Sequence, residues 1–295
     1  MVAIILVNYN GSDDTIECIS SLARCVKQDF FIVVVDNSST DTSVKKLKEA
    51  QSIYKFELLV ALDNKGFSAG NNIGIMYALE QKAEYILLLN NDTIVSPDFL
   101  DYLLEGFKEF PNCGATIGKI LYENQRNKIW YAGGALNHKT ARTEHFNYGK
   151  DNLNKNEALV KVTFATGCCL CLSSESVNKV GLLCEDYFLY EEDTDYSLRL
   201  TERGYDIIYV PKAIIYHKVS ASVGECSPMA QYYITRNKYT LIRKHFMGIN
   251  KVTAYLYSTF QFLNRCRKKE MNIKYCIAGF RAFLKLETGK RAKAI

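Results

Sequence analysis

The sequence contains no hydrophobic stretch long enough to cross a membrane. None of its apolar runs approaches the ~20 consecutive residues that a membrane-spanning helix needs. The N-terminal segment MVAIILVNYN is apolar but short, and it lacks the basic leader of a secretory signal peptide. We therefore expect a protein that is neither exported nor integral to a membrane.

Cysteine is too sparse for a disulfide-based fold, with ten residues in a chain of 295. Small secreted proteins that depend on disulfides have a much denser cysteine framework. Cys168, Cys169 and Cys171 lie together in one apolar segment. We interpret them as reduced, buried thiols of a cytosolic protein and not as zinc ligands.

The glycine spacings of the common phosphate-binding loops are also missing. In KGFSAGNNIG, Gly66, Gly70 and Gly74 are four residues apart, which matches neither G-x-G-x-x-G nor G-x-x-x-x-G-K-[ST]. This disfavours a dinucleotide-dependent dehydrogenase and a P-loop ATPase. Lys65 and the backbone amides near Gly66 can still receive a phosphate, because N–H groups near a helix start attract anions. Plain turn geometry explains these glycines equally well.

The distribution of charge is uneven. Residues 251–295 contain eleven Lys or Arg and two Glu, a net charge of +9, whereas the whole chain carries +5, so residues 1–250 carry −4. A strongly basic C-terminal segment indicates an anionic partner, such as a membrane surface or nucleic acid. We expect no nucleic-acid partner, because the sequence shows no recognition fold and the acidic body would repel a duplex.

Strand and helix patterns alternate over the first 110 residues. The apolar runs predict strands at 2–7, 31–35, 56–61 and 85–89. The helical patterns lie at 14–25, 43–50, 70–81 and 97–110. This alternation is typical of right-handed βαβ units, so we predict an α/β fold built on a mostly parallel, twisted sheet flanked by helices.

The second half of the chain has a different pattern. Residues 113–172 indicate short strands and loops, and the acidic segment that follows indicates a helix ended by Gly204. The segments YDIIYV and AIIYH predict two further strands, and a long helical pattern covers 230–246.

Polar side chains follow each of the first four predicted strands. Since ligands bind beyond the carboxyl ends of parallel strands, these four loops together favour a binding site at one edge of the sheet. The residues concerned are Asn8, Tyr9 and Asn10, then Asp36 and Asn37, then 63–67, and finally Asn90, Asn91 and Asp92.

Two of the chemical groups near this edge suit a metal ion. Asp92, a single carboxylate with two amide neighbours, suits a hard divalent cation that keeps several waters and is shared with substrate phosphates. His217 ends the strand AIIYH. A lone histidine is more often structural, but a neighbouring metal would favour a ligand role, because imidazole is a common metal ligand.

The segment LYEEDTDYSLR concentrates four carboxylates at a helix start: Glu191, Glu192, Asp193 and Asp195. Acids there complement the helix dipole, and Asp195 can pair with Arg199, which accounts for one or two of them. Crowded carboxylates raise one another's pKa values, which suits a general base.

Six motifs in order resemble one known family over roughly residues 2–245. The motifs are VNYNG at 7–11, VVVDNSSTDTS at 33–43, NKGFSAGNNIGI at 64–75, LLLNNDT at 87–93, LYEEDTDYSLR at 189–199 and IIYHKVSAS at 214–222. Together they closely resemble the family-two inverting glycosyltransferases with the GT-A fold. Within that family the chain looks most like the bacterial rhamnosyltransferase-like branch, which builds O-antigen, capsule and related cell-surface polysaccharides.

The resemblance implies roles for the residues at the nucleotide end. Asp36 would contact the nucleoside, and the segment Val7, Asn8 and Tyr9 would line that pocket. The diphosphate and donor sugar would be shaped by the loop and helix start that follow the third strand. These positions are Asn64, Lys65, Gly66, Phe67 and Asn71.

The resemblance also implies the metal site and the base. Asn90, Asn91 and Asp92 occupy the family's D-x-D position, and since the first Asp is an Asn here, Asp92 would be the direct ligand of Mg²⁺ or Mn²⁺. His217 matches a histidine that completes the metal site in some members. Asp193, in the Glu192–Asp193 pair, matches the catalytic base, which would deprotonate an acceptor hydroxyl for a single, inverting displacement.

The expected substrates follow from the same resemblance. The donor would be a nucleoside-diphosphate sugar, with dTDP-rhamnose as first choice and a UDP-hexose or UDP-N-acetylhexosamine next. The acceptor would be a glycan or a glycan on a polyprenyl diphosphate carrier. We expect a GT-A domain at 1–246, with a nucleotide-binding half at about 1–112 and an acceptor-binding half at about 113–246, followed by a basic amphipathic helical tail at 247–295.

The tail predicts attachment to a membrane surface. On a helical projection of residues 273–285, the apolar side chains share one face and the basic ones another, and RCRKK at 265–269 adds further cations. The apolar face comprises Ile273, Cys276, Ile277, Phe280 and Leu284. Such a helix suits an anionic membrane, which would make the protein cytoplasmic and peripheral on the inner face of the cell membrane. Alternatively, the helix packs on its own domain.

Two other functions compete with the transferase. A sugar-phosphate nucleotidyltransferase would also use a parallel sheet, a nucleotide and a metal, but NYNGSDD is acidic where that class has a glycine-rich basic loop. A non-catalytic glycan-binding protein on the same fold is compatible with Asn90. The retained Asp92, Glu192, Asp193 and His217 argue against it.

Overall fold

The computed structural model describes residues 1–25, 29–153, 158–219 and 227–291. The strands are β1 (Val2–Asn8), β2 (Phe30–Asp36), β3 (Glu57–Val60), β4 (Tyr85–Asn90), β5 (Thr93–Val95), β6 (Cys113–Tyr122), β7 (Ile129–Tyr131), β8 (Gly134–Asn137), β9 (Arg142–His145), β10 (Val160–Val162), β11 (Cys169–Ser173) and β12 (Asp206–His217). The helices are α1 (Ser12–Leu22), α2 (Ser43–Ala50), α3 (Phe67–Glu80), α4 (Phe99–Glu109), α5 (Ser174–Val180), α6 (Glu192–Glu202), α7 (Pro228–His245), α8 (Gly248–Arg267) and α9 (Ile273–Leu284).

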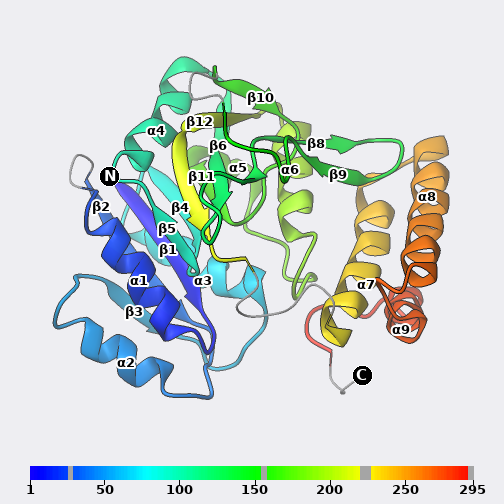
Figure 1. The fold of residues 1–295 in the computed structure, drawn as a ribbon, viewed down its shortest axis with the longest axis horizontal. Helices are drawn as coiled ribbons and strands as arrows, with labels where there is room; N and C mark the ends of the chain where they lie inside the picture. The colour runs from blue at the N-terminus through cyan, green and yellow to red at the C-terminus, as the bar shows by residue number, and fades with distance from the viewer. Residues whose placement is uncertain (26–28, 154–157, 220–226, 292–295) are drawn as a thin grey trace.

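One large sheet runs through the molecule and is flanked by helices on both faces (Figure 1). Its strand order is β10-β12-β6-β11-β4-β1-β2-β3, with β5 beside β12 and β7 beside β6. A separate ribbon of β8 and β9 extends toward the C-terminal helices. This α/β architecture confirms the predicted fold class.

The first 90 residues form a parallel half-sheet. β1 pairs in parallel with β2 and β4, and β2 pairs in parallel with β3. The continuous aliphatic runs of β1 and β2 suit strands that helices cover on both faces. Because these four strands share one direction, the loops after them open on the same edge of the sheet, as the sequence predicts.

The second half of the sheet is mixed in direction. β11 lies between β4 and β6 and is antiparallel to both, with Cys169 opposite Leu89. The segments predicted as two strands, YDIIYV and AIIYH, are one strand, β12, which follows β6 with a register shift between Val210 and Ile214. Pro211 lies at this shift, where a residue without a backbone N–H is tolerated. The predicted division into two strands is therefore wrong.

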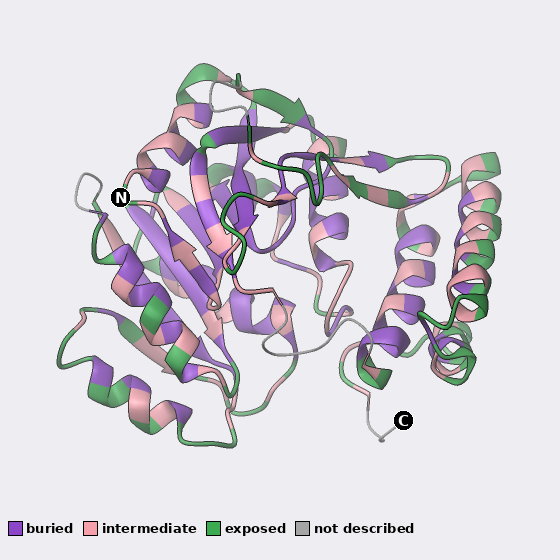
Figure 2. Ribbon diagram, viewed as in Figure 1, coloured by how far each residue is buried: buried purple, intermediate pink, exposed green. Residues whose placement is uncertain are grey.

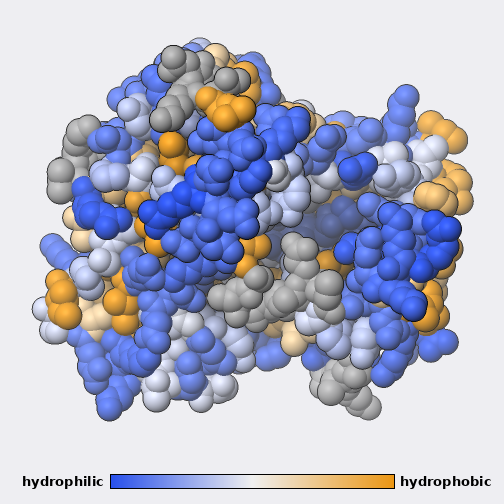
Figure 3. Space-filling model, viewed as in Figure 1, coloured by the Kyte–Doolittle hydropathy of each residue, from blue (hydrophilic) through white to orange (hydrophobic). Residues whose placement is uncertain are grey.

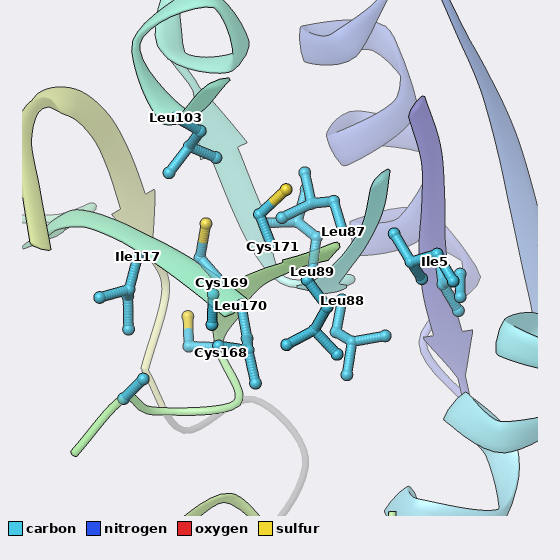
Figure 4. Packing of buried hydrophobic residues seen from close by; sticks show 14 of the residues in the cluster. Ile5, Leu87, Leu88, Leu89, Leu103, Ile117, Cys168, Cys169, Leu170 and Cys171 are labelled. Carbon is cyan, nitrogen blue, oxygen red and sulfur yellow. The ribbon is translucent and has the colours of Figure 1, made fainter. Parts of the chain in front are cut away.

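The apolar core lies where β4 and β11 meet. Figure 4 shows Cys168, Cys169 and Cys171 packed near Leu87, Leu88 and Leu89. All nine cysteines that the structure describes are free thiols. Burial raises the pKa of the Cys169 thiol to about 12, so it remains protonated and unreactive at neutral pH. The interpretation of this cluster as buried thiols is confirmed.

Three helices end the described chain. Ser227 caps α7 by accepting a hydrogen bond from Ala230 N at 3.1 Å. α9 packs closely along α7 at Gly279. A Cβ at this position would lie only 2.5 Å from the carbonyl oxygen of Tyr232, so the close approach requires glycine. α8 lies at the margin of the molecule (Figure 1). Within the described ranges, no helix has the length and apolar character that crossing a membrane requires.

Candidate active site

The end of β4 brings Asp92 to His217. After Asn90 the chain turns into β5, which pairs antiparallel with the last residues of β12, with Thr93 opposite His217. The backbone N–H of Lys218 donates to the carbonyl oxygen of Asp92 at 3.0 Å. This pairing places His217 Nε2 3.1 Å from Asp92 Oδ1. Both side chains are nearly buried, with 8% and 13% of their surfaces exposed.

The donor set at this point fits a cation shared with a substrate. A carboxylate and an imidazole are ordinary ligands of divalent metals. No group of three or more His, Cys, Asp or Glu converges in the described part of the chain, so an all-protein metal cage is not formed there. His217 Nδ1 is buried and has no partner among the described residues. A cation held by these two side chains would keep positions for water and for diphosphate oxygens.

The two asparagines before Asp92 have different surroundings. Asn91 Nδ2 donates to Thr15 Oγ1 at 2.9 Å, and Thr15 Oγ1 donates to Asn8 Oδ1 at 2.9 Å. This chain of contacts ties the loop after β4 to the start of α1 and the end of β1. Asn91 therefore positions its loop, while Asn90 keeps a partly exposed side chain beside it.

Asp36 organises the part of the sheet edge predicted to bind the nucleotide. Its carboxylate accepts hydrogen bonds from Asn8 Nδ2 at 2.7 Å, from Ser39 Oγ at 2.7 Å and from Ser39 N at 2.9 Å. Asp36 has no exposed surface, whereas Tyr9 is 43% exposed. Val7 lies under the start of α3, where its side chain would contact a Cβ on Gly70. Of the four residues predicted to contact the nucleoside, Tyr9 is the one that faces solvent.

The loop after β3 docks on the segment that precedes α6. Gly66 has φ +101°, and a Cβ there would lie 2.2 Å from the carbonyl oxygen of Phe188. The next residue, Phe67, donates its backbone N–H to the same oxygen at 3.0 Å. Asn64 Oδ1 accepts from Gly66 N at 2.9 Å, while Lys65 is mostly exposed. The predicted donor loop is thus fixed against the predicted catalytic loop.

Two neighbouring asparagines on α3 have different tasks. Asn71 Nδ2 donates to the carbonyl oxygen of Phe67 at 3.0 Å, so this side chain bonds to the first turn of its own helix. Asn72 crosses to the 183–185 segment, where it bonds Leu183 in both directions at 3.0 Å and Glu185 Oε1 at 2.9 Å. The sequence singled out Asn71 and missed Asn72, because nothing local distinguishes a contact 111 residues away.

Asp193 lies in the first turn of α6 and keeps part of its surface exposed. Its Oδ2 accepts from Gly167 N at 3.1 Å, and its Oδ1 accepts from Thr194 N at 2.7 Å. Burial raises the pKa of this carboxyl, and the two amides oppose the rise without cancelling it. A carboxylate that is held, accessible and more basic than usual is suited to accept a proton.

Glu192 is the buried neighbour of Asp193. It is 7% exposed, and its Oε2 has no hydrogen-bond partner among the described residues. Burial, followed by the charge of Asp193, raises the pKa of Glu192 well above its usual range. Of the two, Asp193 is therefore the more accessible carboxylate, while burial disfavours the charged form of Glu192.

The other two acids of the cluster are used in ion pairs. Asp195 Oδ2 accepts from Arg199 Nε at 2.7 Å, as predicted, and its Oδ1 lies 2.8 Å from His245 Nε2 on α7. Glu191 lies 2.8 Å from Lys238 Nζ, also on α7. These pairs leave Glu192 and Asp193 as the carboxylates of the cluster that structural pairing does not explain.

The backbone before Asp193 adopts an unusual turn. Tyr190 and Glu191 have φ values of 71° and 73°, a left-handed conformation that is costly for residues other than glycine. Asn237 Nδ2 donates to the carbonyl oxygens of Leu189 and Tyr190 at 2.8 and 2.9 Å. Its own Oδ1 accepts from Arg236 Nε at 2.8 Å, which orients the amide. Asn237 on α7 therefore stabilises the turn that precedes and positions Asp193.

Residues 167 and 168 link the end of β4, where the metal site is predicted, with Asp193, the predicted base. Cys168 O accepts the backbone N–H of Asn90 at 2.9 Å, and Gly167 N donates to Asp193. The ring of Trp130 on β7 lies 4.9 Å from that of His217, between centroids. The surface in Figure 3 is hollowed below the β8–β9 ribbon, between the sheet and the C-terminal helices. Residues 220–222 of the last motif lie outside the described residues.

Residues 3–181 match the family described as glycosyl transferase family 2. The chain belongs to glycosyl transferase family 2. Among curated glycosyl transferase family 2 relatives, it is 24% identical to dTDP-rhamnosyl transferase RfbF of Shigella flexneri, over 82% of this chain and 79% of that protein. It is 23% identical to the N-acetylglucosaminyl-diphospho-decaprenol L-rhamnosyltransferase of Mycobacterium tuberculosis, over 76% of this chain and 78% of that protein.

Solved glycosyltransferase structures share the fold at low sequence identity. TarS residues 1–349 of S. aureus, in complex with UDP-GlcNAc, superposes with a TM-score of 0.61 at 16% identity, over 97% of this chain and 81% of that one. The mannosyltransferase PcManGT of Pyrobaculum calidifontis, in complex with GDP-Man and Mn²⁺, gives a TM-score of 0.61 at 13% identity, over 96% and 86%. These likenesses confirm the GT-A fold that the motifs predicted.

Proposed function

We propose that this protein is an inverting glycosyltransferase of cell-surface polysaccharide synthesis. It would move a sugar from a nucleoside-diphosphate donor to a hydroxyl of a glycan or lipid-linked acceptor. The observation that carries the proposal is the position of Asp193. Its accessible, basic carboxylate is bonded to Gly167, next to the residue that anchors the Asp92 edge.

The donor we favour is dTDP-rhamnose, with a UDP-hexose or UDP-N-acetylhexosamine next. Two curated relatives named as rhamnosyltransferases support this choice. Tyr9 supplies an exposed aromatic surface for the nucleoside base, beside the loop that Asp36 organises. Lys65 lies just before the start of α3, where its charge and the helix dipole favour an anionic diphosphate.

Catalysis would be a single displacement. The Asp193 carboxylate takes the proton of the acceptor hydroxyl, and that oxygen attacks the anomeric carbon from the face opposite the diphosphate. The bond from the anomeric carbon to the diphosphate oxygen breaks, the nucleoside diphosphate leaves with the electron pair, and the anomeric configuration inverts. Gly167 N and Thr194 N hold the carboxylate, so much of the rate gain comes from positioning.

Asp92 and His217 are the residues that would hold Mg²⁺ or Mn²⁺. The cation would supply positive charge to the departing diphosphate. The Mn²⁺ named with the solved mannosyltransferase supports a metal of this kind. Asp92 and His217 contact each other directly, and without a cation the largely buried Asp92 carboxylate would repel a diphosphate.

The acceptor we favour is a glycan on a polyprenyl diphosphate carrier. That carrier would place the enzyme at the cytoplasmic face of the membrane as a peripheral protein. In this proposal, residues 1–246 form the catalytic domain, about 1–112 binds the nucleotide, about 113–246 binds the acceptor, and 247–295 form the tail.

The proposal is tested by a donor screen. Thermal shifts are measured with dTDP, UDP and GDP and their sugars, each with and without Mn²⁺, and released nucleoside diphosphate is then quantified. We expect one nucleoside series to stabilise the protein in a metal-dependent manner and to turn over. Stabilisation by glycans alone, with no donor binding or turnover, would instead identify a glycan-binding protein.

A further inference from the structure

The outward face of α8 is an apolar stripe. It consists of side chains spaced three or four residues apart, each between 52% and 73% exposed: Ile249, Val252, Leu256, Phe260 and Leu263. This spacing places them on one side of the helix. Orange patches at the margin of the molecule where α8 lies mark hydrophobic side chains (Figure 3).

The stripe is unusual for a helix that faces water. Residues 252–264 contain no charged side chain, whereas the solvent face of a helix in a soluble domain normally carries charges. α8 makes its own packing contacts with the opposite side, where Ala254, Ser258 and Phe262 are buried. Figure 2 shows little buried surface along α8 compared with α7. The stripe is therefore not used to hold the fold together.

α9 repeats this arrangement. Its small residues Cys276, Gly279 and Ala282 are buried, and α7 is the helix it packs against. The sequence placed Cys276 on the apolar face, but the structure buries it on the packing side. Four other apolar side chains of α9 are exposed by 39% to 62%: Ile273, Ile277, Phe280 and Leu284. Packing on the protein's own domain therefore leaves the apolar face of α9 largely uncovered.

The charges around these faces decide which partner fits. Arg267 follows Leu263 at the next helical position of the stripe, and Lys268 and Lys269 continue into the turn. Residues 251–295 carry a net charge of +9 against −4 for the rest of the chain. A second copy meeting this face would bring its own cations against these, which is unfavourable. An anionic lipid surface provides both an apolar phase and the opposite charge.

We propose that the outer faces of α8 and α9 form a docking surface for an anionic lipid bilayer. α8 lies along the membrane, with Leu256 and Phe260 at the level of the acyl chains and the basic turn at 267–269 among the headgroups. This docking stands on exposure and charge alone, so it is independent of which sugar is transferred. It refines the sequence-based prediction, which gave the membrane contact to the tail at 247–295 and did not say which helix faces meet the lipid.

Vesicle co-sedimentation tests the surface without donor or acceptor. The full chain is mixed with vesicles of phosphatidylcholine alone or with added phosphatidylglycerol, at low and high salt. We expect binding to the anionic vesicles, weakened by salt and absent with phosphatidylcholine alone. Leu256→Glu should weaken that binding by about tenfold or more, because it removes buried apolar surface and adds a repelled charge.

A matched variant separates this effect from general surface damage. Ile53→Glu also converts an exposed aliphatic side chain, 75% exposed against 67% for Leu256, but it lies between α2 and β3. It should bind vesicles like the unchanged protein. The proposal is wrong if the unchanged chain ignores anionic vesicles, if both variants bind equally, or if Leu256→Glu instead converts a dimer into a monomer. Donor binding by Leu256→Glu should be normal, so failure of the docking and failure of the transferase are distinguishable.

Discussion

The backbone amide of Gly167 donates a 3.1 Å hydrogen bond to Oδ2 of Asp193. The next residue, Cys168, accepts a hydrogen bond from Asn90 at the end of β4. Two adjacent residues therefore connect a carboxylate on α6 with the turn that carries Asp92. In the proposed function, this arrangement would let Asp193 as proton acceptor and a cation at Asp92 act on the same small substrate.

Gly66 should be intolerant of any side chain. Its φ is +101°, and a Cβ at this position would lie 2.2 Å from Phe188 O, which leaves no space for alanine. We expect Gly66→Ala to lower the free energy of unfolding by about 3 kcal/mol or more, because strain and a backbone clash add. Donor affinity should fall as well, since the 64–67 loop would move. Denaturant unfolding and donor titration measure the two effects.

Gly181 is the matched control for this substitution. Its φ is +90° with ψ −176°, close to the +101° and −178° of Gly66, but a Cβ there meets nothing within 4 Å. Gly181→Ala should therefore cost only the backbone strain, about 1–2 kcal/mol. Equal losses for the two variants would show that the contact between Gly66 and Phe188 is unimportant.

Asp92→Ala should abolish metal dependence. The variant loses the carboxylate beside His217, so we expect donor affinity in Mn²⁺ to fall by about tenfold or more. Calorimetric titration of donor with and without Mn²⁺ measures the difference. Asp151→Ala, which removes an exposed carboxylate paired with Lys128, is the control and should keep the metal effect. A metal effect that survives Asp92→Ala would move the cation site elsewhere.

Activity should be lost on acidification at a pH above the usual pKa range of an aspartate. Burial raises the pKa of Asp193, and the base acts only when it is deprotonated, so turnover should fall as pH decreases through that raised value. Thr194 Oγ1 donates to Asp193 Oδ1 at 3.3 Å and opposes the rise. Thr194→Val should therefore move the acidic limb of kcat/KM to higher pH, whereas Thr194→Ser should leave it in place. A limb unchanged by Thr194→Val would argue against Asp193 as the titrating group.

Asn237 should act as a positioning residue for the base. Asn237→Ala removes both bonds to the Leu189 and Tyr190 carbonyls, so the left-handed turn before Asp193 loses its support. We expect kcat to fall by about tenfold to a hundredfold with donor affinity retained. Thr240→Ala, which removes a hydrogen bond within α7 to Arg236 O, should lower stability without changing kcat. Similar kinetics for both variants would reduce Asn237 to a structural role.

Local pattern predicted the parallel half of the fold well. β1, β2 and β4 are apolar runs that end in one polar residue, β3 begins with Glu57, and all four lie within one residue of their predicted bounds. Helix starts were less predictable. α1 begins at Ser12 and not at 14. α3 begins at Phe67 and not at 70, because the close contact of Gly66 with Phe188 ends the preceding loop there. No local signal reveals a boundary that is set by a distant carbonyl.

The candidate site residues could be chosen from the sequence, whereas the contacts that hold them in place could not. Asp92, His217 and Asp193 stood out as polar groups in recognisable motifs. Gly167 and Asn237 did not, because their roles come from contacts with residues 26 and 47 positions away. Ion pairing of Asp195 with Arg199 was predictable at helical spacing, whereas its second partner, His245 on α7, required the tertiary fold.

Turnover by Asp193→Asn tests the central claim most directly. The substitution keeps the size of the side chain and removes its ability to accept the acceptor's proton. Released nucleoside diphosphate and donor affinity are measured together. We predict that turnover falls by about 10³-fold or more while donor affinity stays within about twofold, and that Glu192→Gln retains measurable turnover. Normal turnover by Asp193→Asn would contradict the account and direct attention to Glu192 or Asp195 as the base.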